Sequence, residues 1–436
     1  MLKFISNLNI YIFVLFTVLY FYRNIYIFIA LKSKKKKEQT IVPKALHKYA
    51  VIIAARNEEA VLGELIQSIK SQKYPKDLVD IFVIADNCTD NTAQIARDEG
   101  AIVYTRNNQT LKGKGYALNF LFKIIAKEHS QENYEGFFVF DADNLLDENY
   151  IAEMNKYFDK GFNVLTSYRN SKNYGYNWIS AGYALWFLHE AEYLNKPRMI
   201  LGKSCAISGT GFLVHSDIIK RNGGWKHFLL TEDIEFSISE IIKGETIGYC
   251  GSAILYDEQP TTLKQSWDQR LRWAKGFYQV FSRYGKKILK CSFQRKKQSF
   301  SCYDMMMTIM PALLITIMSV FINGMFLAIG LLNPKLGQGQ AIIKETFSAI
   351  SSSFVIYYII LFVLGLITTI TEWKHIYSPT VKKICYLFTF PLFMFTYIPI
   401  AIVALFKKVE WDPIEHTCVT SLTEVRGCDV QKKPIN

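Results

Sequence analysis

Long apolar stretches lie near both ends of the chain, and the first of them is Leu8–Leu31. About 20 apolar residues suffice for a helix to span a bilayer, so this stretch predicts a transmembrane helix. Arg23 interrupts it, and a charge at this depth is costly unless the side chain reaches the head groups or meets a partner. Met305–Leu332 and Phe354–Ile370 predict two more spans. We expect Asn333–Ser353 between them to be an outside loop, because it is poor in Lys and Arg.

The last apolar stretch, Ile384–Phe406, differs from the others because it contains Pro391 and Pro399 and is flanked by pairs of lysines. Proline interrupts a helix, and basic residues at both ends argue against a simple crossing. We therefore predict a broken, re-entrant or interfacial segment that leaves the following tail in the cytosol. A fourth span is the alternative.

Short apolar runs alternate with amphipathic segments in the central part of the chain, residues 48–290. Strands that alternate with helices indicate a mostly parallel, Rossmann-like α/β sheet, in which ligands bind at the carboxyl ends of the strands. The strands expected here are Tyr49–Ala55, Val79–Ala85, Ala101–Thr105 and Phe137–Phe140. The helices expected between them cover residues 62–69, 92–99 and 116–127.

Composition agrees with a soluble domain that carries membrane segments, since 50% of the residues are hydrophobic and 20% are charged. Lys32 and Lys34–Lys37 follow the first span directly, so the positive-inside rule predicts a multi-pass cell-membrane protein whose central domain is cytosolic. Membrane anchoring explains the net charge of +13 better than nucleic-acid binding does. The eight cysteines form no CxxC pair, which is typical of reduced, buried cysteines.

The predicted domains follow from these patterns. They are an N-terminal transmembrane helix (1–32), a cytosolic α/β domain (33–264), interfacial helices (265–300), C-terminal membrane helices (301–408) and a cytosolic tail (409–436).

Charged residues follow the first two predicted strands. Arg56 and Glu58 come after the first strand, and Asp86 ends the second. Such residues lie in the crevice where α/β folds bind nucleotides, and a carboxylate there can accept hydrogen bonds from a base or ribose. Each of them alone is also typical of turns and helix caps. The chain has no GxxxxGK loop, which excludes a P-loop enzyme.

The fourth predicted strand leads into Asp141 and Asp143, two carboxylates separated by one residue. Mg²⁺ or Mn²⁺ is held by one or two carboxylates together with substrate phosphates, so this pair is a candidate metal site. Gly209 and Thr210 follow as candidate acceptor-binding residues, and then Asp233 in a Thr-Glu-Asp triplet. An acid in the cleft can deprotonate a sugar hydroxyl, although acids in a first helical turn also stabilise the helix.

The segment Gln269–Trp273 combines two arginines with a tryptophan. The guanidinium of Arg272 can bind a leaving diphosphate, and the ring of Trp273 offers a flat surface to a sugar. An amphipathic helix at head-group depth has the same composition. Both descriptions hold together if a glycan enters the membrane at this level.

Taken together and in this order, the acidic residues and the Gln-x-x-Arg-Trp motif resemble family 2 glycosyltransferases of the processive, membrane-integrated kind. That group comprises cellulose, hyaluronan, chitin and poly-N-acetylglucosamine synthases. The resemblance covers residues 48–290 and implies a GT-A fold. It implies that Asp86 binds uridine, that Asp141 and Asp143 hold the metal and diphosphate, and that Asp233 is the general base. Gln269, Arg272 and Trp273 would bind diphosphate and acceptor.

Two weaker matches concern other parts of the chain. Lys112 lies where a family lysine approaches the nucleotide, and Arg56 and Glu58 join it as candidate donor-binding residues. Trp411 and His416 lie where related synthases carry a gating loop that closes over the nucleotide. The chain departs from many cellulose synthases because no cyclic-dinucleotide-binding domain follows the tail. Only one predicted span precedes the catalytic domain, so we expect a narrow channel to need lipid or a second subunit, either a homo-oligomer or a partner.

The resulting hypothesis is an inverting, metal-dependent hexosyltransferase that uses a UDP-sugar, with UDP-glucose favoured. Its acceptor would be a growing β-linked polysaccharide, with a β-glucan favoured, and the product would cross the membrane. The alternatives are a poly-N-acetylglucosamine-type synthase and a non-processive glycolipid glycosyltransferase. A transport or scaffold protein with a degenerate nucleotide fold is a further class, against which the complete acidic set argues.

Overall fold

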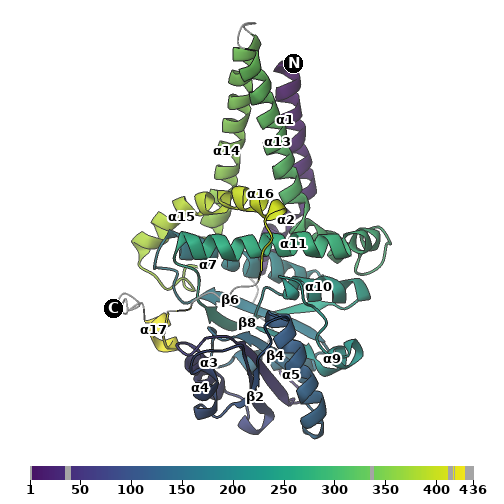
Figure 1. Cartoon of the computed structure of the whole chain (residues 1–436), viewed down its shortest axis with the longest axis vertical. Coiled ribbons are helices and arrows are strands. Elements are labelled where there is room, and N and C mark those ends of the chain that lie inside the picture. Colours follow the sequence, from purple (N-terminus) through teal and green to yellow (C-terminus); the bar gives the residue numbers. More distant parts are fainter. Residues whose placement is uncertain (1, 35–40, 334–337, 411–415, 417, 428–436) are drawn as a thin grey trace.

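A computed structural model describes residues 2–34, 41–333, 338–410, 416 and 418–427. Figure 1 shows three levels: an α/β domain, a layer of helices lying across it, and a group of helices standing upright on that layer. The sheet strands span residues 49–257, inside the region predicted for the α/β domain.

The α/β domain is built on an eight-stranded sheet with the order β3-β2-β1-β4-β7-β6-β8-β5. The four strands β3, β2, β1 and β4 are parallel, as predicted. The other half is mixed, because β7 runs antiparallel to both β4 and β6, and β5 is antiparallel to β8. The strands are β1 (Tyr49–Ala55), β2 (Val79–Asp86), β3 (Ile102–Arg106), β4 (Gly136–Asp141), β5 (Leu145–Leu146), β6 (Val164–Ser171), β7 (Phe212–His215) and β8 (Ile247–Asp257).

Helices cover both faces of the sheet, which explains why its strands are continuous apolar runs. Ala50 and Ile52 of β1 pack into one core with Leu118 of α5, whereas Val51 and Ile53 pack into another with Leu65 of α3. The helices of this domain are α3 (Leu62–Lys70), α4 (Thr92–Asp98), α5 (Lys114–Glu128), α6 (Tyr150–Asp159), α9 (Ser216–Asn222) and α10 (Glu232–Lys243).

A layer of helices lies across the domain between the sheet and the upright helices (Figure 1). It contains α7, whose C-terminal end continues through a π-helical turn (Ala191–Asn195) into α8, and the long helix α11 that carries Gln269–Trp273. The bounds in this layer are α7 (Trp178–Glu190), α8 (Lys196–Ile200), α11 (Leu263–Ser292), α12 (Ser299–Ile309), α15 (Thr380–Phe395) and α16 (Tyr397–Phe406).

The prediction that Ile384–Phe406 is broken is confirmed, because α15 ends at Phe395 and α16 begins at Tyr397. Figure 1 shows both helices lying across the molecule rather than standing beside the upright group. Residues 380–406 are nevertheless one of four helical segments that are long and apolar enough to cross a membrane in the described part of the chain. The other three are α1 (Leu2–Tyr20), α13 (Pro311–Leu332) and α14 (Gln338–Thr371).

The upright helices differ from the predicted spans in their bounds. The first predicted span is divided into two helices, α1 and α2 (Tyr22–Ser33). The hydroxyls of Tyr22 and Tyr26 donate to Asp304 and attach α2 to α12. The second begins later, at Pro311, since a proline is favoured at the first position of a helix. The loop predicted up to Ser353 was wrong from residue 338 onward, where α14 is already helical.

One pair of cysteines differs from the prediction that the cysteines are reduced. Cys291 and Cys302 are joined as a disulfide between the end of α11 and α12. The free cysteines among the described residues are Cys88, Cys205, Cys250, Cys385 and Cys418.

Candidate active site

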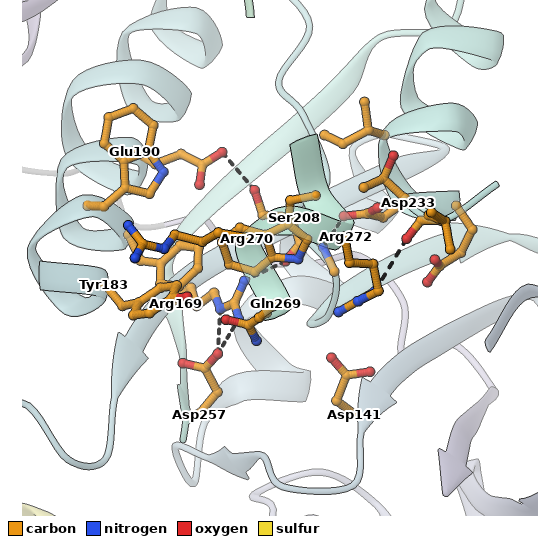
Figure 2. Close-up of a pocket in the computed structure, with 18 of the residues that line it drawn as sticks. Asp141, Arg169, Tyr183, Glu190, Ser208, Asp233, Asp257, Gln269, Arg270 and Arg272 are labelled. Carbon is orange, nitrogen blue, oxygen red and sulfur yellow. Dashed lines mark hydrogen bonds and ion pairs between the residues drawn. The ribbon is translucent and has the colours of Figure 1, made fainter. Parts of the chain in front are cut away.

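A cavity of about 420 Å³ extends from the carboxyl ends of β1, β2 and β4 to the base of the upright helices. Enclosed sites of this size hold small ligands. Figure 2 shows part of its lining, with Asp141, Asp233 and Arg272 grouped on one side of the view and Arg169, Asp257, Tyr183 and Glu190 on the other. Most of the residues predicted for the site line this one cavity. They are Arg56, Glu58, Asp86, Asp141, Asp143, Gly209, Asp233, Gln269, Arg272, Trp273 and His416.

One end of the cavity contains Asp86 at the end of β2. Its carboxylate is buried and forms an ion pair with Arg106, which faces it across the β2–β3 register, and it accepts a hydrogen bond of 3.0 Å from Asn87. Burial raises the pKa of Asp86, while Arg106 opposes the rise. Sequence reasoning missed Arg106, whose only signal was a basic residue at the end of the neighbouring strand.

His416 of the tail lies among three carboxylates at this end. Its ring nitrogens are 3.9 Å from Glu58, 3.8 Å from Asp143 and 3.6 Å from Glu258. Burial opposes a charged imidazolium, but these carboxylates outweigh it and raise the pKa of His416 to about 10. Burial raises the pKa of Glu58 to about 8, against the effect of His416. The tail therefore brings a cation over the acidic end of the cavity; Trp411 lies outside the described residues.

Asp141 and Asp143 lie directly after β4, as predicted. Asp143 is 5% exposed, and its Oδ2 accepts the backbone N–H of Glu258 at 2.9 Å. The side chain of Asp141 is 37% exposed and pairs with Lys114 at 2.5 Å. One carboxylate held by the backbone and one facing the cavity suit a hard cation that completes its coordination with phosphates and water. The described residues contain no cluster of three metal-binding side chains, so substrate oxygens would have to supply the remaining ligands.

The lysine of the site is Lys114, two residues beyond the predicted Lys112. Lys112 is exposed and does not line the cavity, whereas the Nζ of Lys114 contacts Asp141 and also donates to the carbonyl of Gly209 at 2.9 Å. The reason is that Gly113 has φ 118° and precedes α5, so the turn directs Lys114 inward at the start of that helix.

The turn Ser208–Thr210 connects several of these groups. The N–H of Gly209 donates to Asp233 Oδ2 at 2.5 Å, and the carbonyl of Ser208 accepts from Arg169 at 2.9 Å. The hydroxyl of Thr210 accepts the N–H of Asp141 at 2.9 Å. This turn lies beside the end of β4 because β7 runs antiparallel to that strand, and the N–H of Gly211 donates to Val139 at 3.0 Å.

Thr210 was predicted to contact the acceptor, but the structure gives it another position. It is 3% exposed, does not line the large cavity, and uses its hydroxyl to hold Asp141 and Asn144. Thr210 therefore positions the end of β4. Gly209 has φ 80° and does line the cavity, where it leaves room beside Asp141.

Asp233 lies in the first turn of α10, next to Glu232. Burial raises the pKa of Glu232 to about 7, with a further rise from the neighbouring Asp233. Burial likewise raises the pKa of Asp233, while hydrogen bonds from the N–H groups of Ile234 and Gly209 and the charge of Lys114 oppose it. A carboxylate whose pKa is raised toward the working pH is a better proton acceptor than an ordinary one.

Helix α11 brings Gln269, Arg272 and Trp273 to the cavity. The guanidinium of Arg272 donates to the carbonyl of Leu230 at 3.3 Å and has no carboxylate partner among the described residues. Gln269 Oε1 is buried and has no hydrogen-bond partner among the residues that the structure describes. The ring of Trp273 meets Tyr183 at 5.7 Å and Phe187 at 6.3 Å, both edge to face. A cation, an amide and an aromatic ring thus face the space beside Asp233.

Arg270, between these residues, has a structural position that the sequence did not indicate. It is 2% exposed and donates to the carbonyl of Phe393 at 3.1 Å and to the hydroxyl of Thr396 at 2.6 Å. These acceptors lie at the break between α15 and α16, where helical carbonyls lose their normal partners. Arg270 therefore fixes the broken segment to α11.

Three further lining residues were missed by sequence reasoning. Arg169 of β6 forms an ion pair with Asp257 of β8 and stacks on Phe187, with its guanidinium carbon 3.7 Å from the ring centroid. Glu190, at the end of α7, accepts the hydroxyl of Ser208 at 2.7 Å. Burial raises the pKa of Asp257 to about 6, against the effect of Arg169. No short motif marks these residues, because they come from separate elements.

The other end of the cavity, here called the helix-base end, is lined by Tyr20, Arg23, Met307, Thr308 and Ala312. These residues lie where α1, α2, α12 and α13 meet. The hydroxyl of Tyr20 donates to the carbonyl of Met307 at 2.7 Å and accepts the N–H of Ala312 at 3.0 Å. One side chain thus joins the end of α1 to the break between α12 and α13.

Known proteins resemble both the sequence and the fold. A probable glycosyltransferase, YdaM of Bacillus subtilis, is 29% identical over 283 residues, which cover 60% of this chain and 62% of YdaM. A β-monoglucosyldiacylglycerol synthase of Synechocystis is 28% identical over 240 residues, 54% of this chain and 48% of that protein. A poly-β-1,6-N-acetyl-D-glucosamine synthase of Staphylococcus aureus is 26% identical over 244 residues, 53% of this chain and 55% of the synthase. The chain thus spans about half to three-fifths of the length of these relatives.

A solved structure shares the fold over nearly the whole chain. The mannosyltransferase PcManGT from Pyrobaculum calidifontis, in complex with GDP-Man and Mn²⁺, matches with a TM-score of 0.55 over 93% of this chain and 99% of its own, at 14% identity. That likeness includes the GT-A-like sheet. The model of the family described as "Glycosyltransferase like family 2" matches residues 47–276, more than half of the chain. With this match over the α/β domain and the start of α11, the chain belongs to the family 2 glycosyltransferases.

Proposed function

We propose that this glycosyltransferase moves a hexose, with inversion, from a UDP-sugar to a hydroxyl of a glycolipid at the membrane surface. UDP-glucose is the donor to test first. The observation that carries the proposal is the course of the cavity, which leads from Asp86 to the helix-base end and includes no described residue of α14. An acceptor that enters from the membrane surface therefore reaches Asp233 without crossing the bilayer.

The donor would lie with its uracil and ribose near Asp86 and Arg56 and its diphosphate toward Asp141, Asp143 and Arg272. Arg272 suits this role because its charge faces the cavity without a carboxylate partner among the described residues. A divalent cation held by Asp141 and Asp143 would neutralise charge on the departing diphosphate. Lys114, which is paired with Asp141, would add a second positive group there.

The acceptor hydroxyl attacks the anomeric carbon on the face opposite the diphosphate. The new C–O bond forms as the bond from that carbon to the phosphate oxygen breaks, and UDP leaves with the electron pair. Asp233 takes the hydroxyl proton. Its Oδ2 is held by Gly209, so the carboxylate keeps one orientation throughout the step.

A second candidate is the synthesis of a β-linked polysaccharide. It is favoured by the aromatic group of Trp273, Tyr183 and Phe187, because sugar rings pack on such surfaces, and by the likeness to a poly-N-acetylglucosamine synthase. Translocation would need a path between the upright helices. Their contact is closed by Ile5, Phe326 and Ile342 and by the paired amides of Asn9 and Asn323, so a second subunit would have to complete the path.

Product analysis tests both candidates. Purified protein in lipid nanodiscs is incubated with radiolabelled UDP-glucose and a glycolipid extract, and the organic and aqueous phases are separated. Label in one discrete glycolipid supports the first candidate, and a high-molecular-mass ladder supports the second. Release of the free sugar alone, from each of several labelled UDP-sugars and with both acceptor types present, would contradict both.

A further inference from the structure

Arg23 lies at the helix-base end of the catalytic cavity, two residues after the start of the turn that separates α1 from α2. Tyr20, Met307, Thr308 and Ala312 line the same end of the cavity. If α1, α13 and α14 cross the bilayer, this end lies at head-group depth, because all three helices stand beyond it in Figure 1. The position thus combines access to the catalytic cavity with access to lipid.

The positive charge of Arg23 is not neutralised by its neighbours. Its guanidinium carbon is 4.8 Å from the ring centroid of Tyr20, and its Nε is 3.5 Å from the hydroxyl of Tyr22. No carboxylate among the described residues lies within 4.0 Å of it. A guanidinium has five N–H donors, and these contacts use few of them.

The nearby acid, Asp304, is already fully engaged. Its Oδ2 accepts from Arg198 and Tyr26, each at 2.8 Å. Its Oδ1 accepts from Arg198 at 2.9 Å and from Tyr22 at 2.8 Å. Arg198 and Asp304 are both 1% exposed, so they form a closed pair that leaves Arg23 as the additional charge.

Other features of this end favour an anion as well. Helix α13 begins at Pro311, so the positive end of a 22-residue helix lies beside Ala312 in the lining. Burial and the charge of Arg23 lower the pKa of His189 to about 3, so that imidazole stays neutral. Arg23 therefore supplies the positive charge of this end, since His189 is neutral and the N–H of Ala312 already donates to Tyr20. In a partly apolar space a bound anion would be stabilised by this charge more than in water.

We propose that Arg23 binds a phosphate group of the lipid acceptor, which makes the acceptor a phosphate-bearing glycolipid rather than a neutral one. This inference rests on the function proposed above. The fork of the guanidinium matches two phosphate oxygens, which a neutral glycolipid does not offer. The phosphate belongs either to a phospholipid head group or to the group that links a sugar to a polyprenyl chain, and the two sources carry the same chemistry.

The test compares three glycosylated acceptors in nanodiscs with labelled UDP-glucose: a neutral glycosyldiacylglycerol, a glycosylated phospholipid and a polyprenyl-phosphate-linked sugar. Removal of a hydrogen-bonded charge typically weakens binding by about 10- to 100-fold. We expect Arg23→Gln to raise the KM for one phosphate-bearing acceptor by that factor, while the KM for UDP-glucose and its hydrolysis without acceptor stay unchanged. Arg23→Lys keeps the charge but loses the forked guanidinium, so its KM for that acceptor should lie between those of the wild type and Arg23→Gln. The preferred phosphate-bearing acceptor identifies the source.

Lys32→Gln is the matched control, because Lys32 is an exposed basic residue of α2 that does not line the cavity. It should leave all three KM values unchanged. If Arg23→Gln weakens the neutral and phosphate-bearing acceptors equally, or lowers donor hydrolysis in parallel, Arg23 is a membrane anchor and the inference fails while the proposed function stands. If the wild-type protein transfers to no lipid but elongates a soluble glycan, the proposed function itself fails.

Discussion

The backbone of Gly209 contacts two opposite charges, because its N–H donates to Asp233 and its carbonyl accepts from Lys114. The adjacent Ser208 and Thr210 connect the same turn to Glu190 and to the backbone of Asp141. The orientations of the candidate base, the candidate metal ligand and the lysine therefore depend on three consecutive residues. Gly209 has φ 80°, a backbone conformation that a side chain disfavours.

Replacement of Asp233 by asparagine should abolish transfer while UDP binding stays close to that of the wild type. Asparagine keeps the shape but cannot accept the acceptor proton, and loss of a general base typically costs about 10²–10⁴-fold in rate. Transfer is measured with labelled donor, and UDP binding by calorimetry. Asp217→Asn, at an exposed acid of α9, is the control and should keep full activity. Turnover near that of the control would exclude Asp233 as the base.

The rate of transfer should decrease at acidic pH, with a midpoint above that of an ordinary aspartate. Burial raises the pKa of Asp233 above the ordinary aspartate value of about 3.9, so protonation of the base begins at a higher pH than for an exposed aspartate. Because the base must be ionised, activity is present above its pKa and is lost below it. A pH profile of kcat at saturating donor measures this. A midpoint at or below the ordinary aspartate value of about 3.9 would contradict the raised pKa.

Activity should require Mg²⁺ or Mn²⁺ and disappear on treatment with EDTA. Asp141 and Asp143 are the described acids that could share a divalent cation with the donor diphosphate. Without the charge of the cation, the two carboxylates would repel the negatively charged diphosphate. The assay adds back Mg²⁺, Mn²⁺ or Ca²⁺ after EDTA and records the rate. An unchanged rate in EDTA would mean that Arg272 and Lys114 stabilise the leaving group without a metal.

At the scale of elements, α11 connects the cavity to the helices that lie across the domain. One part of its surface carries Gln269, Arg272 and Trp273 to the cavity, and Arg270 fixes the break between α15 and α16. Tyr278 adds a second contact by donating to the carbonyl of Ala401 at 2.9 Å. The break at Thr396 is therefore attached to α11 on both sides, by Arg270 and by Tyr278.

Trp273→Ala should reduce transfer to the acceptor much more than hydrolysis of the donor. Its ring packs edge to face on Tyr183 and Phe187 and leaves a surface toward the cavity, where a sugar ring can pack, whereas water needs no aromatic platform. UDP release and glycosylated product are measured on the same folded protein. Equal losses of both, at matched protein level, would mean that Trp273 only supports the packing of α7 and α11.

At the scale of the whole molecule, the tail returns to the α/β domain. Helix α17 (Leu422–Arg426) docks there through Val425, which packs on Leu145 and Tyr256, and through an ion pair of Arg426 with Asp147. The N–H of Cys418 donates to Glu258 at 3.0 Å. The tail and the catalytic domain therefore lie on the same side of the upright helices, and His416 lies two residues before the first of these anchored positions.

We expect that side to be the cytosol. With the other cysteines replaced, Cys418 should not react with an impermeant thiol reagent on intact cells and should react after permeabilisation and unfolding. Leu332→Cys is the positive control, because Leu332 is 81% exposed at the far end of α13 and should be labelled on intact cells. Strong labelling of Cys418 on intact cells would place the tail outside and exclude a cytosolic gating role for His416.

The continuous apolar runs of the sequence predicted the bounds of the four parallel strands to within one or two residues, because a buried strand is apolar along its whole length. Acids at strand ends likewise predicted Asp86, Asp141 and Asp143, since parallel strands bring their carboxyl ends to one edge. The prolines and lysines around Ile384–Phe406 predicted its break. These features depend on residues that are close in the sequence.

The tertiary structure alone decided the features that depend on contacts between distant residues. Arg106, Arg169, Glu190 and Asp257 reach the site from separate strands and helices, so no short motif marks them. Lys114 replaced Lys112 because the backbone of Gly113 sets which lysine points inward. From the sequence, Arg23 is a costly charge within a predicted span. In the structure the helix is interrupted after Tyr20, the hydroxyl of Tyr22 donates to Asp304, and Arg23 lines the end of the cavity. Hydrophobicity predicts that a segment is buried, whereas only packing determines which polar side chain meets which partner.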